Sequence, residues 1–341
     1  MKTIISSLFC LAILFNVACN SNKSITSDKD NKIINGTNDS LHLTNGKIIE
    51  QIPFTLPDKI IDKAERFDPG IKATISEVKL FHLTYLSDGL KVKGYLAIPK
   101  KEGKFPCIIF NRGGNKDFSK ITDEGWGTGV LVELSSKGYI IVASQYRGND
   151  GGEGKEEFGG RDINDVLNLI PLLSKMPQAD TSRIGMFGWS RGGMMTYLAL
   201  SKTSKIKAAV VGSGSTDLVK ALETRPEQES SVFEKLIPDY KLNKIQELQS
   251  RSAVYFAEKI CKTTPILILQ GTADWRVPTP LVLNLVNQFY QLKQPFRFIL
   301  YEGGQHSLKE HSNDYIQQTI NWFDTYLRDK KSWPSLEPHG D

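Results

Sequence analysis

The chain has 341 residues, of which 24% are charged and 40% are hydrophobic, a composition typical of a globular protein that buries a large core. One large domain is the expected organisation. The formal net charge is only +5, and the lysines and arginines are interspersed with acidic residues instead of forming a stripe. This distribution argues against a nucleic acid partner.

The N-terminal stretch MKTIISSLFCLAILFNVAC predicts an export signal over residues 1–19, because a lysine precedes an apolar run too short to span a membrane. The small residue Ala18 stands before Cys19, so the stretch resembles a bacterial lipoprotein signal. That resemblance implies a lipid anchor on Cys19 and a protein exported to the bacterial cell envelope. The alternative is plain secretion after a nearby cut by another peptidase.

Residues 20–50 are rich in Asn, Ser, Thr, Asp and Lys, which predicts a flexible tether ahead of a folded domain over 51–330 and a polar tail over 331–341. At the start of the domain, VKLFHLTYLSDGLKVKGYLAIP holds two alternating runs around the turn Ser87-Asp88-Gly89. This pattern predicts an antiparallel hairpin at the edge of a sheet.

Five continuous apolar runs follow the hairpin, and strands buried on both faces have this pattern. They are FPCIIF, GYIIVASQ, RIGMFG, IKAAVVGSG and TPILILQG, separated by stretches long enough for helices. Helices are expected over 162–175, where Asp162 would be the cap, after Ser190, over 280–292 and over 314–327. The predicted fold is an open α/β sheet, mostly parallel, with an antiparallel N-terminal hairpin and helices on both faces.

Four cysteines are present, and Cys10 and Cys19 belong to the signal. Cys107 and Cys261 each lie near an apolar strand-like run, where a cysteine is more often a small buried hydrophobe than part of a disulfide or a metal site. The chain has no metal-ligand spacing, and no cofactor is expected.

The pentapeptide Gly188-Trp189-Ser190-Arg191-Gly192 matches G-x-S-x-G, and it follows a predicted strand and opens a predicted helix. This is the context of a nucleophile elbow, in which a tight turn exposes the serine hydroxyl above the carboxyl ends of the strands. Ser190 is therefore the candidate nucleophile.

A serine nucleophile needs a base, and His306 is the candidate because it follows the strand-like run FRFILYEGG and precedes the last helix. His311 is the alternative, with a solvated surface position as its ordinary explanation. For the carboxylate that orients the base we favour Asp274, which directly follows ILILQG and gives the chain order Ser, Asp, His. Asp217 is the rival acid, with capping of the next helix as its ordinary role.

The oxyanion that forms during acyl transfer needs hydrogen-bond donors. One is expected from the backbone N–H of Arg191, and the second from the loop after FPCIIF, where Gly113 and Gly114 allow close backbone approach. We favour Gly114, although glycine pairs also make plain turns.

From about Leu83 to Leu327 the chain resembles the catalytic domain of the prolyl oligopeptidase family of serine peptidases. The segments that carry the resemblance are NRGG, SQYRGNDGGEG, FGGRDINDVLNLI, GWSRGG, GTADWRVP and GGQHS, in that order. The resemblance implies an α/β-hydrolase fold, a Ser190-Asp274-His306 triad and a peptide substrate. The chain departs from the family in two ways: it lacks room for the β-propeller that restricts substrate size, and Arg112 stands where some members have an oxyanion tyrosine or histidine.

These departures keep two enzymatic hypotheses open. The first is a peptidase that forms an acyl-enzyme, and the alternative is a carboxylesterase acting on small or sugar-linked esters. A third hypothesis is a surface lipoprotein that binds ligands on a hydrolase fold without catalysis, but no triad member is missing. Trp189 and Trp275 adjoin the candidate catalytic residues and either line a pocket or pack. The sequence does not indicate an oligomeric state.

Overall fold

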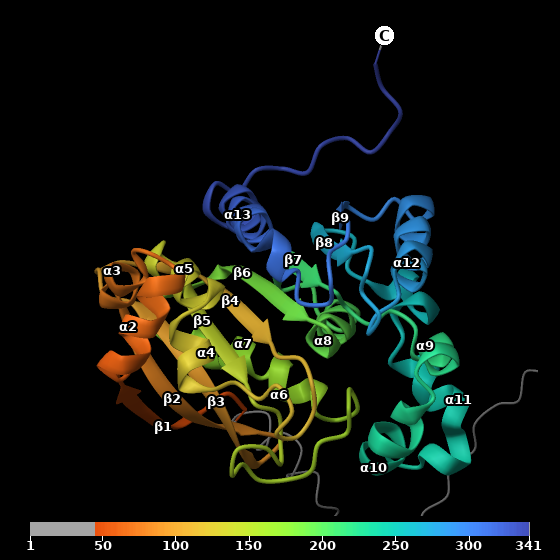
Figure 1. Cartoon of the computed structure of the whole chain (residues 1–341), viewed down its shortest axis with the longest axis horizontal. Helices are drawn as coiled ribbons and strands as arrows, with labels where there is room; N and C mark the ends of the chain where they lie inside the picture. The colour runs from red at the N-terminus through yellow and green to blue at the C-terminus, as the bar shows by residue number, and fades with distance from the viewer. Residues whose placement is uncertain (1–44, 341) are drawn as a thin grey trace, which may run out of the picture. The chain divides into compact units, whose positions relative to one another are not determined.

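The computed structural model describes residues 45–340. Its strands form one sheet in the order β1-β2-β3-β5-β4-β6-β7-β8-β9. The strands are β1 (Ile48–Phe54), β2 (Val78–Ser87), β3 (Leu90–Pro99), β4 (Phe105–Asn111), β5 (Ile140–Ser144), β6 (Ala179–Trp189), β7 (Ile206–Gly212), β8 (Ile266–Gly271) and β9 (Phe296–Tyr301). Figure 1 shows β1–β3 at one end of the sheet and β7–β9 at the other.

The helices lie between and beside these strands. They are α2 (Asp58–Phe67), α3 (Ile71–Ser76), α4 (Asp123–Gly127), α5 (Val130–Ser136), α6 (Ile163–Leu167), α7 (Leu169–Ser174), α8 (Arg191–Leu200), α9 (Leu218–Thr224), α10 (Glu234–Leu236), α11 (Tyr240–Ser250), α12 (Thr279–Gln291) and α13 (Ser312–Phe323). Among the described residues, no helix is both long and apolar enough to cross a membrane.

The N-terminal strands are antiparallel. β2 pairs with β3 from Val78 opposite Pro99 to Ser87 opposite Leu90. Asp88 and Gly89 both have positive φ, 52° and 80°, as a two-residue hairpin turn requires. The predicted hairpin is therefore confirmed. β1 pairs with β2 on the outer side and includes residues 48–50, which the sequence assigned to the tether.

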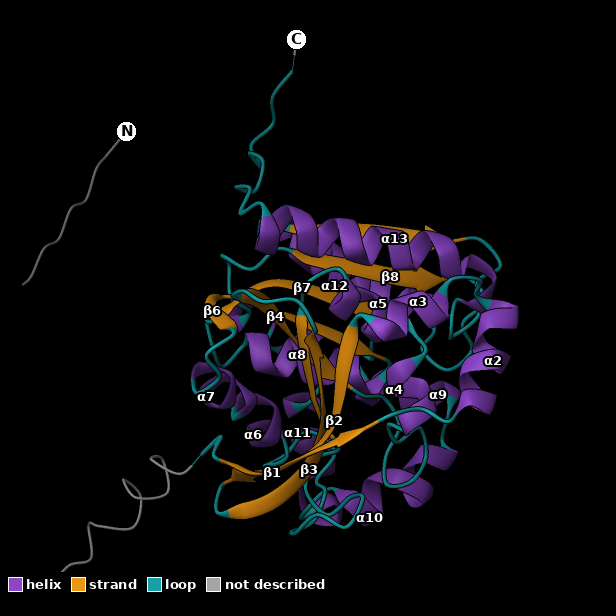
Figure 2. Cartoon of the chain, turned by 90° about the vertical axis from the view of Figure 1, so that its left-hand side faces the viewer, coloured by secondary structure: helices purple, strands orange, loops and turns teal. Residues whose placement is uncertain are grey.

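From β5 to β9 all neighbouring strands are parallel, so the predicted fold class, an open and mostly parallel α/β sheet, is confirmed. Figure 2 shows α6 and α7 on one side of the sheet and α2 and α4 on the other. Two buried apolar clusters follow from this layering, one holding Leu172 of α7 and Phe289 of α12, the other Leu131 of α5 and Phe323 of α13. The sheet is thus covered on both faces, as its continuous apolar runs predict.

The helix expected over 162–175 is two short helices. α6 ends at Leu167, and Pro171 has no N–H to continue the helical hydrogen bonding. Asp162 has helical backbone angles and makes no capping hydrogen bond from its side chain. Its carboxylate instead accepts the N–H of Gly159, which lies before it in the chain, so the expected cap is wrong.

Both described cysteines are free, and Cys107 is completely buried on β4. Burial raises the pKa of the Cys107 thiol to about 12, which leaves it un-ionised at neutral pH. Cys261 is partly exposed. The predicted signal over 1–19, including Cys10 and the lipidation candidate Cys19, lies outside the described residues.

Candidate active site

Ser190 occupies the turn between β6 and α8 with φ 58° and ψ −124°, a conformation that a residue with a side chain rarely adopts. Gly188 and Gly192 make this turn possible. A Cβ at Gly188 would collide with the carbonyl of Gly192, and a Cβ at Gly192 would collide with the carbonyl of Asn111 on β4. The turn therefore has the strained strand-to-helix geometry of a nucleophile elbow.

His306 lies in the loop after β9, and its Nε2 is 2.9 Å from Ser190 Oγ. The loop is fastened to the elbow by a second contact, since the indole N–H of Trp189 donates to the carbonyl of His306 at 2.9 Å. The structure thus places the predicted base within hydrogen-bond distance of the predicted nucleophile, the geometry that proton transfer requires.

Asp274 follows β8 and is almost completely buried. Its Oδ2 is 2.8 Å and its Oδ1 is 3.0 Å from His306 Nδ1, and Oδ1 also accepts the N–H groups of Arg276 and Val277. Burial acts to raise the pKa of Asp274, but the hydrogen bond and charge interaction with His306 and the two backbone N–H groups together outweigh burial, so that the pKa lies below its usual value. The carboxylate is therefore ionised beside the imidazole at neutral pH.

The two rival residues make hydrogen bonds outside the proposed triad. His311 Nε2 is 3.0 Å from the carbonyl of Glu302, and its ring packs on Tyr301. Asp217 caps α9 by accepting the N–H of Lys220 at 3.1 Å, the ordinary role considered for it. Neither residue makes a hydrogen bond to Ser190 or His306 in the part of the chain that the structure describes.

Gly113 and Gly114 follow β4 and lie beside the elbow. A Cβ at Gly113 would be 3.3 Å from Ser190 Cβ and 3.9 Å from Ser190 Oγ. Gly114, with φ 63°, lines the same cavity as Ser190 and Arg191. Arg191 is the first residue of α8, so its N–H has no partner within the helix. The structure thus brings both expected sources of oxyanion donors to the serine.

Arg112, the departure from the family pattern, is only 1% exposed and points into the protein, not toward the serine hydroxyl. Its guanidinium donates to the carbonyls of Gly113 at 3.2 Å, Lys116 at 3.1 Å and Gln145 at 3.2 Å. The side chain therefore holds the glycine loop through hydrogen bonds to its backbone carbonyls.

A cavity of about 380 Å³ opens beside Ser190. Trp275, which is 64% exposed, lines it together with Phe118, Arg225 and Arg276, whereas Trp189 packs against Tyr315 and is not part of this cavity. The long β7–β8 connection supplies Arg225 and nine further lining residues: Ser215, Thr216, Asp217, Leu218, Ala221, Glu227, Gln228, Ser231 and Val232. Figure 1 shows the helices of this connection, α9, α10 and α11, gathered on one side of the molecule.

Sequence reasoning missed one group of residues near the site, the buried acids Glu156 and Asp162 and the buried guanidinium of Arg191 with which both make ion pairs. The sequence contained one signal for this group. Acidic residues, Glu156 and Asp162 among them, stand among the glycines of GGEGKEEFGGRD, a stretch that would otherwise be a plain solvent loop.

A serine hydroxyl, an imidazole and a carboxylate above the carboxyl ends of a mostly parallel sheet, together with structural neighbours of this fold, define the protein as a serine hydrolase with the α/β-hydrolase fold. The family model described as "Prolyl oligopeptidase family" matches residues 128–330. The chain belongs to this family.

Three relatives give the scale of the similarity. "Uncharacterized peptidase YtmA" of Bacillus subtilis (strain 168) is 30% identical over 247 residues, which cover 72% of this chain and 93% of that protein. "Putative esterase YitV" of the same organism is 28% identical over 253 residues, which cover 68% of this chain and 95% of that protein. A crystal structure of Pyrococcus horikoshii acylaminoacyl peptidase has a TM-score of 0.59 at 23% identity and covers 78% of this chain and 43% of that one.

Proposed function

We propose that the protein is a peptidase that cleaves peptides through an acyl-enzyme, with Ser190 as nucleophile, His306 as general base and Asp274 as the group that orients the base. One observation carries this proposal: Asp274, His306 and Ser190 form a continuous chain of hydrogen bonds of 2.8 Å and 2.9 Å. Membership of a peptidase family supports the peptide substrate.

The geometry suits a two-step reaction. Ser190 Oγ attacks the substrate carbonyl while His306 Nε2 takes the hydroxyl proton, and the backbone N–H groups of Arg191 and Gly114 stabilise the oxyanion. His306 then returns the proton to the leaving amine, and the acyl group stays on Ser190. A water molecule, activated by the same imidazole, hydrolyses the acyl-enzyme and regenerates the serine.

The proposed nucleophile is tested by labelling with a fluorophosphonate, which phosphonylates an activated serine. We expect one label per wild-type chain, none on Ser190→Ala, and very slow labelling of His306→Ala, because an unassisted hydroxyl is a weak nucleophile at neutral pH. His311→Ala is the matched control and is expected to keep most of the activity. Undiminished labelling of the Ser190→Ala variant, measured by intact mass, would refute the proposal.

A carboxylesterase is the second candidate, favoured by the sequence similarity to YitV, which extends over 95% of that protein. The discriminating measurement is kcat/KM for a peptidyl p-nitroanilide against the ester of the same acyl group, alongside acetylated and feruloylated sugars. Cleavage of the anilide and of peptides supports the peptidase. Inert anilides and peptides, together with rapid turnover of a sugar ester or a simple ester, would replace the peptidase with the esterase.

A further inference from the structure

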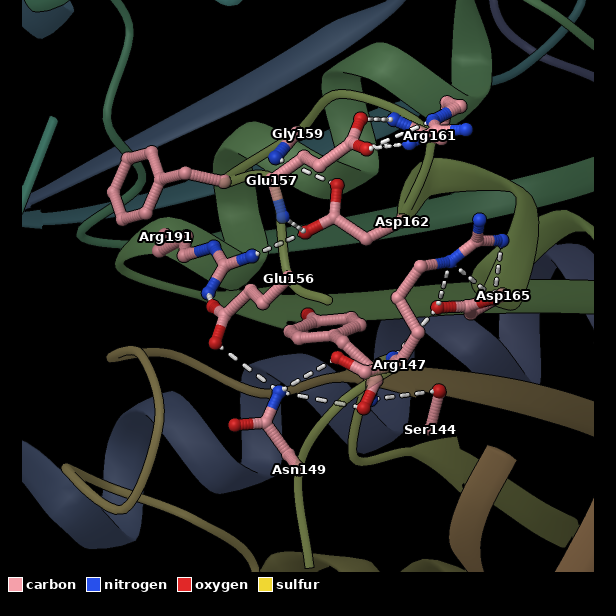
Figure 3. Close-up of polar contacts among 12 residues, drawn as sticks. Ser144, Arg147, Asn149, Glu156, Glu157, Gly159, Arg161, Asp162, Asp165 and Arg191 are labelled. Atoms are coloured by element: carbon pink, nitrogen blue, oxygen red, sulfur yellow. Dashed lines mark hydrogen bonds and ion pairs between the residues drawn. The ribbon is translucent and has the colours of Figure 1, made fainter. Parts of the chain in front are cut away.

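The side chain of Arg191, next to the proposed nucleophile, is only 3% exposed. Figure 3 shows its guanidinium pointing toward Glu156 and Asp162. Nη1 makes an ion pair with Glu156 Oε1, and Nη2 donates to Asp162 Oδ2 at 2.8 Å. Two carboxylates from the segment after β5 thus hold a guanidinium that belongs to the first residue of α8.

The same guanidinium reaches the glycine loop after β4. Nη1 of Arg191 donates to the carbonyl of Gly114 at 2.9 Å. Glu156 adds a second link, since its Oε2 accepts the backbone N–H of Lys116 at 2.9 Å and the side-chain amide of Asn149 at 3.1 Å. Residues 114–116 are therefore held at both ends, directly by Arg191 and indirectly through Glu156.

The guanidinium has little freedom to move. It lies between two aromatic faces, with its central carbon 4.7 Å from the ring centre of Tyr146 and 4.5 Å from that of Phe158. Asp162 is itself fixed, because it accepts the N–H groups of Gly159 and Glu157. A planar fork stacked between two rings sets the direction of each of its hydrogen bonds, which a lysine ammonium cannot do.

Net stability alone is a weak explanation for this arrangement, because the cost of burying charges offsets much of what a buried ion pair contributes. Orientation is the better explanation. The backbone of Arg191 supplies one proposed oxyanion donor and its side chain holds the residue that supplies the other. We propose that the guanidinium of Arg191 is a positioning group that sets the distance between the N–H of Arg191 and the N–H of Gly114.

This inference rests on the proposed acyl-enzyme mechanism and adds to it a device for aligning the oxyanion site. It predicts an effect on the transition state more than on substrate binding, since the donors contact an oxygen that carries full charge only in the tetrahedral state. A displacement of one donor by a fraction of an ångström is then expected to lower kcat while KM changes little.

The test uses Arg191→Lys, which keeps the charge and loses the fork. For an activated ester we expect kcat to fall about 100-fold with KM within about threefold of wild type. The affinity for a peptidyl trifluoromethyl ketone, which forms a tetrahedral adduct on the serine, is expected to weaken in parallel with kcat. Wild-type kcat and wild-type affinity for this ketone in a folded Arg191→Lys protein would overturn the inference.

Arg251→Lys is the matched control. Arg251 is also 3% exposed and donates to the carbonyl of Phe158 and to the carboxylate of Glu247, but it has no hydrogen bond to residues 113–116. Its replacement is expected to lower the Tm without the selective loss of kcat. If both lysine variants show equal losses of kcat in proportion to their losses of Tm, the role of Arg191 is structural and the inference is wrong.

Glu156→Gln keeps the test decisive if Arg191→Lys does not fold. Different oxygens of Glu156 accept from Arg191 and from the N–H of Lys116. In glutamine one of these two positions is an NH2 group, which cannot accept, so only one of the two contacts is kept. We expect kcat to fall about tenfold at constant KM, whereas unchanged kcat would overturn the inference. Failure of the proposed mechanism gives a different result, because wild-type Ser190 would then not be labelled by the fluorophosphonate.

Discussion

Asp274 makes two kinds of contact, one with the imidazole of His306 and one with the backbone of its own loop. Its two oxygens face His306, and Oδ1 also accepts two backbone N–H groups of its own loop. The backbone contacts fix the carboxylate. In the proposed mechanism, its contact with Nδ1 holds the imidazole in the tautomer whose Nε2 accepts the proton of Ser190. An amide in place of the carboxylate can keep the shape of this arrangement but not its charge.

We therefore expect Asp274→Asn to lower kcat by about 1,000-fold or more, through the wrong histidine tautomer and an unstabilised imidazolium. Asp217→Asn serves as the control, since Asp217 caps α9 and makes no contact with the imidazole. Its amide oxygen can still accept the N–H of Lys220, so the expected loss is less than about threefold. Steady-state kinetics of both variants decides the assignment, and the reverse ranking would make Asp217 the acid.

The lowered pKa of Asp274 also predicts a pH dependence of stability. A carboxylate with a folded-state pKa below its unfolded value, about 3.9, stabilises the fold above that value, and this contribution is lost as the pH falls through the folded-state pKa. The difference in free energy of unfolding between wild type and Asp274→Asn is therefore expected to shrink from neutral pH to about pH 3. Urea unfolding at both pH values measures it, and a difference that grows on acidification would contradict the expectation.

At the scale of elements, the β6–α8 elbow depends on close approach between α8 and β4. Gly192→Ala would push a methyl group into the backbone carbonyl of Asn111, which cannot move without disturbing the sheet. We expect a loss of about 2 kcal/mol or more in the free energy of unfolding, despite the better helix propensity of alanine.

The matched control for this substitution is Gly129→Ala, at the start of α5. Its added Cβ would be 3.6 Å from the carbonyl of Gly125, an ordinary contact, and φ is −116°. Gly129 is the N-cap of α5, where alanine is less favourable than glycine, so the expected loss is up to about 1 kcal/mol. Equal free energies of unfolding for the two variants, measured by urea denaturation, would show that the contact of α8 with β4 is not tight.

The elements show what sequence patterns can and cannot predict. The parallel strands were predictable because burial on both faces leaves continuous apolar runs, and the hairpin because Asp-Gly suits its turn. β1 was missed since it lies at the sheet edge with five of its seven residues exposed, so IIEQIPF has no clear alternation. Backbone hydrogen bonds to β2 define this strand, and composition does not record them.

The candidate site was predictable for a related reason. Ser190, Asp274 and His306 each follow a strand of the parallel sheet, and the carboxyl ends of parallel strands meet at one edge. The partners of Arg191 were not predictable, because Glu156 and Asp162 reach it through a loop whose path depends on tertiary contacts. The sequence shows an arginine after the serine but not that its side chain is buried.

At the scale of the whole molecule, the predicted lipoprotein signal remains a proposal, and Cys19 is its testable residue. We expect a mature chain that begins at a diacylated Cys19 and partitions with membranes, because two acyl chains give stable anchoring. Mass spectrometry of the N-terminal peptide measures this, with Cys19→Ala as the variant expected to lose the lipid mass. An unmodified mature N-terminus at another residue would remove the proposal.

The β7–β8 connection carries many of the residues that line the cavity beside Ser190 on a single segment of the chain. It supplies ten of the residues that line the cavity beside Ser190 but none of the three proposed triad residues. It starts and ends at adjacent strands that are paired with each other. A replacement of the segment that carries α9, α10 and α11 must keep the side chains that this segment adds to the core, such as Phe233 and Leu248. The cavity-lining residues of this segment can be varied while Ser190, Asp274 and His306, which lie outside it, keep their positions.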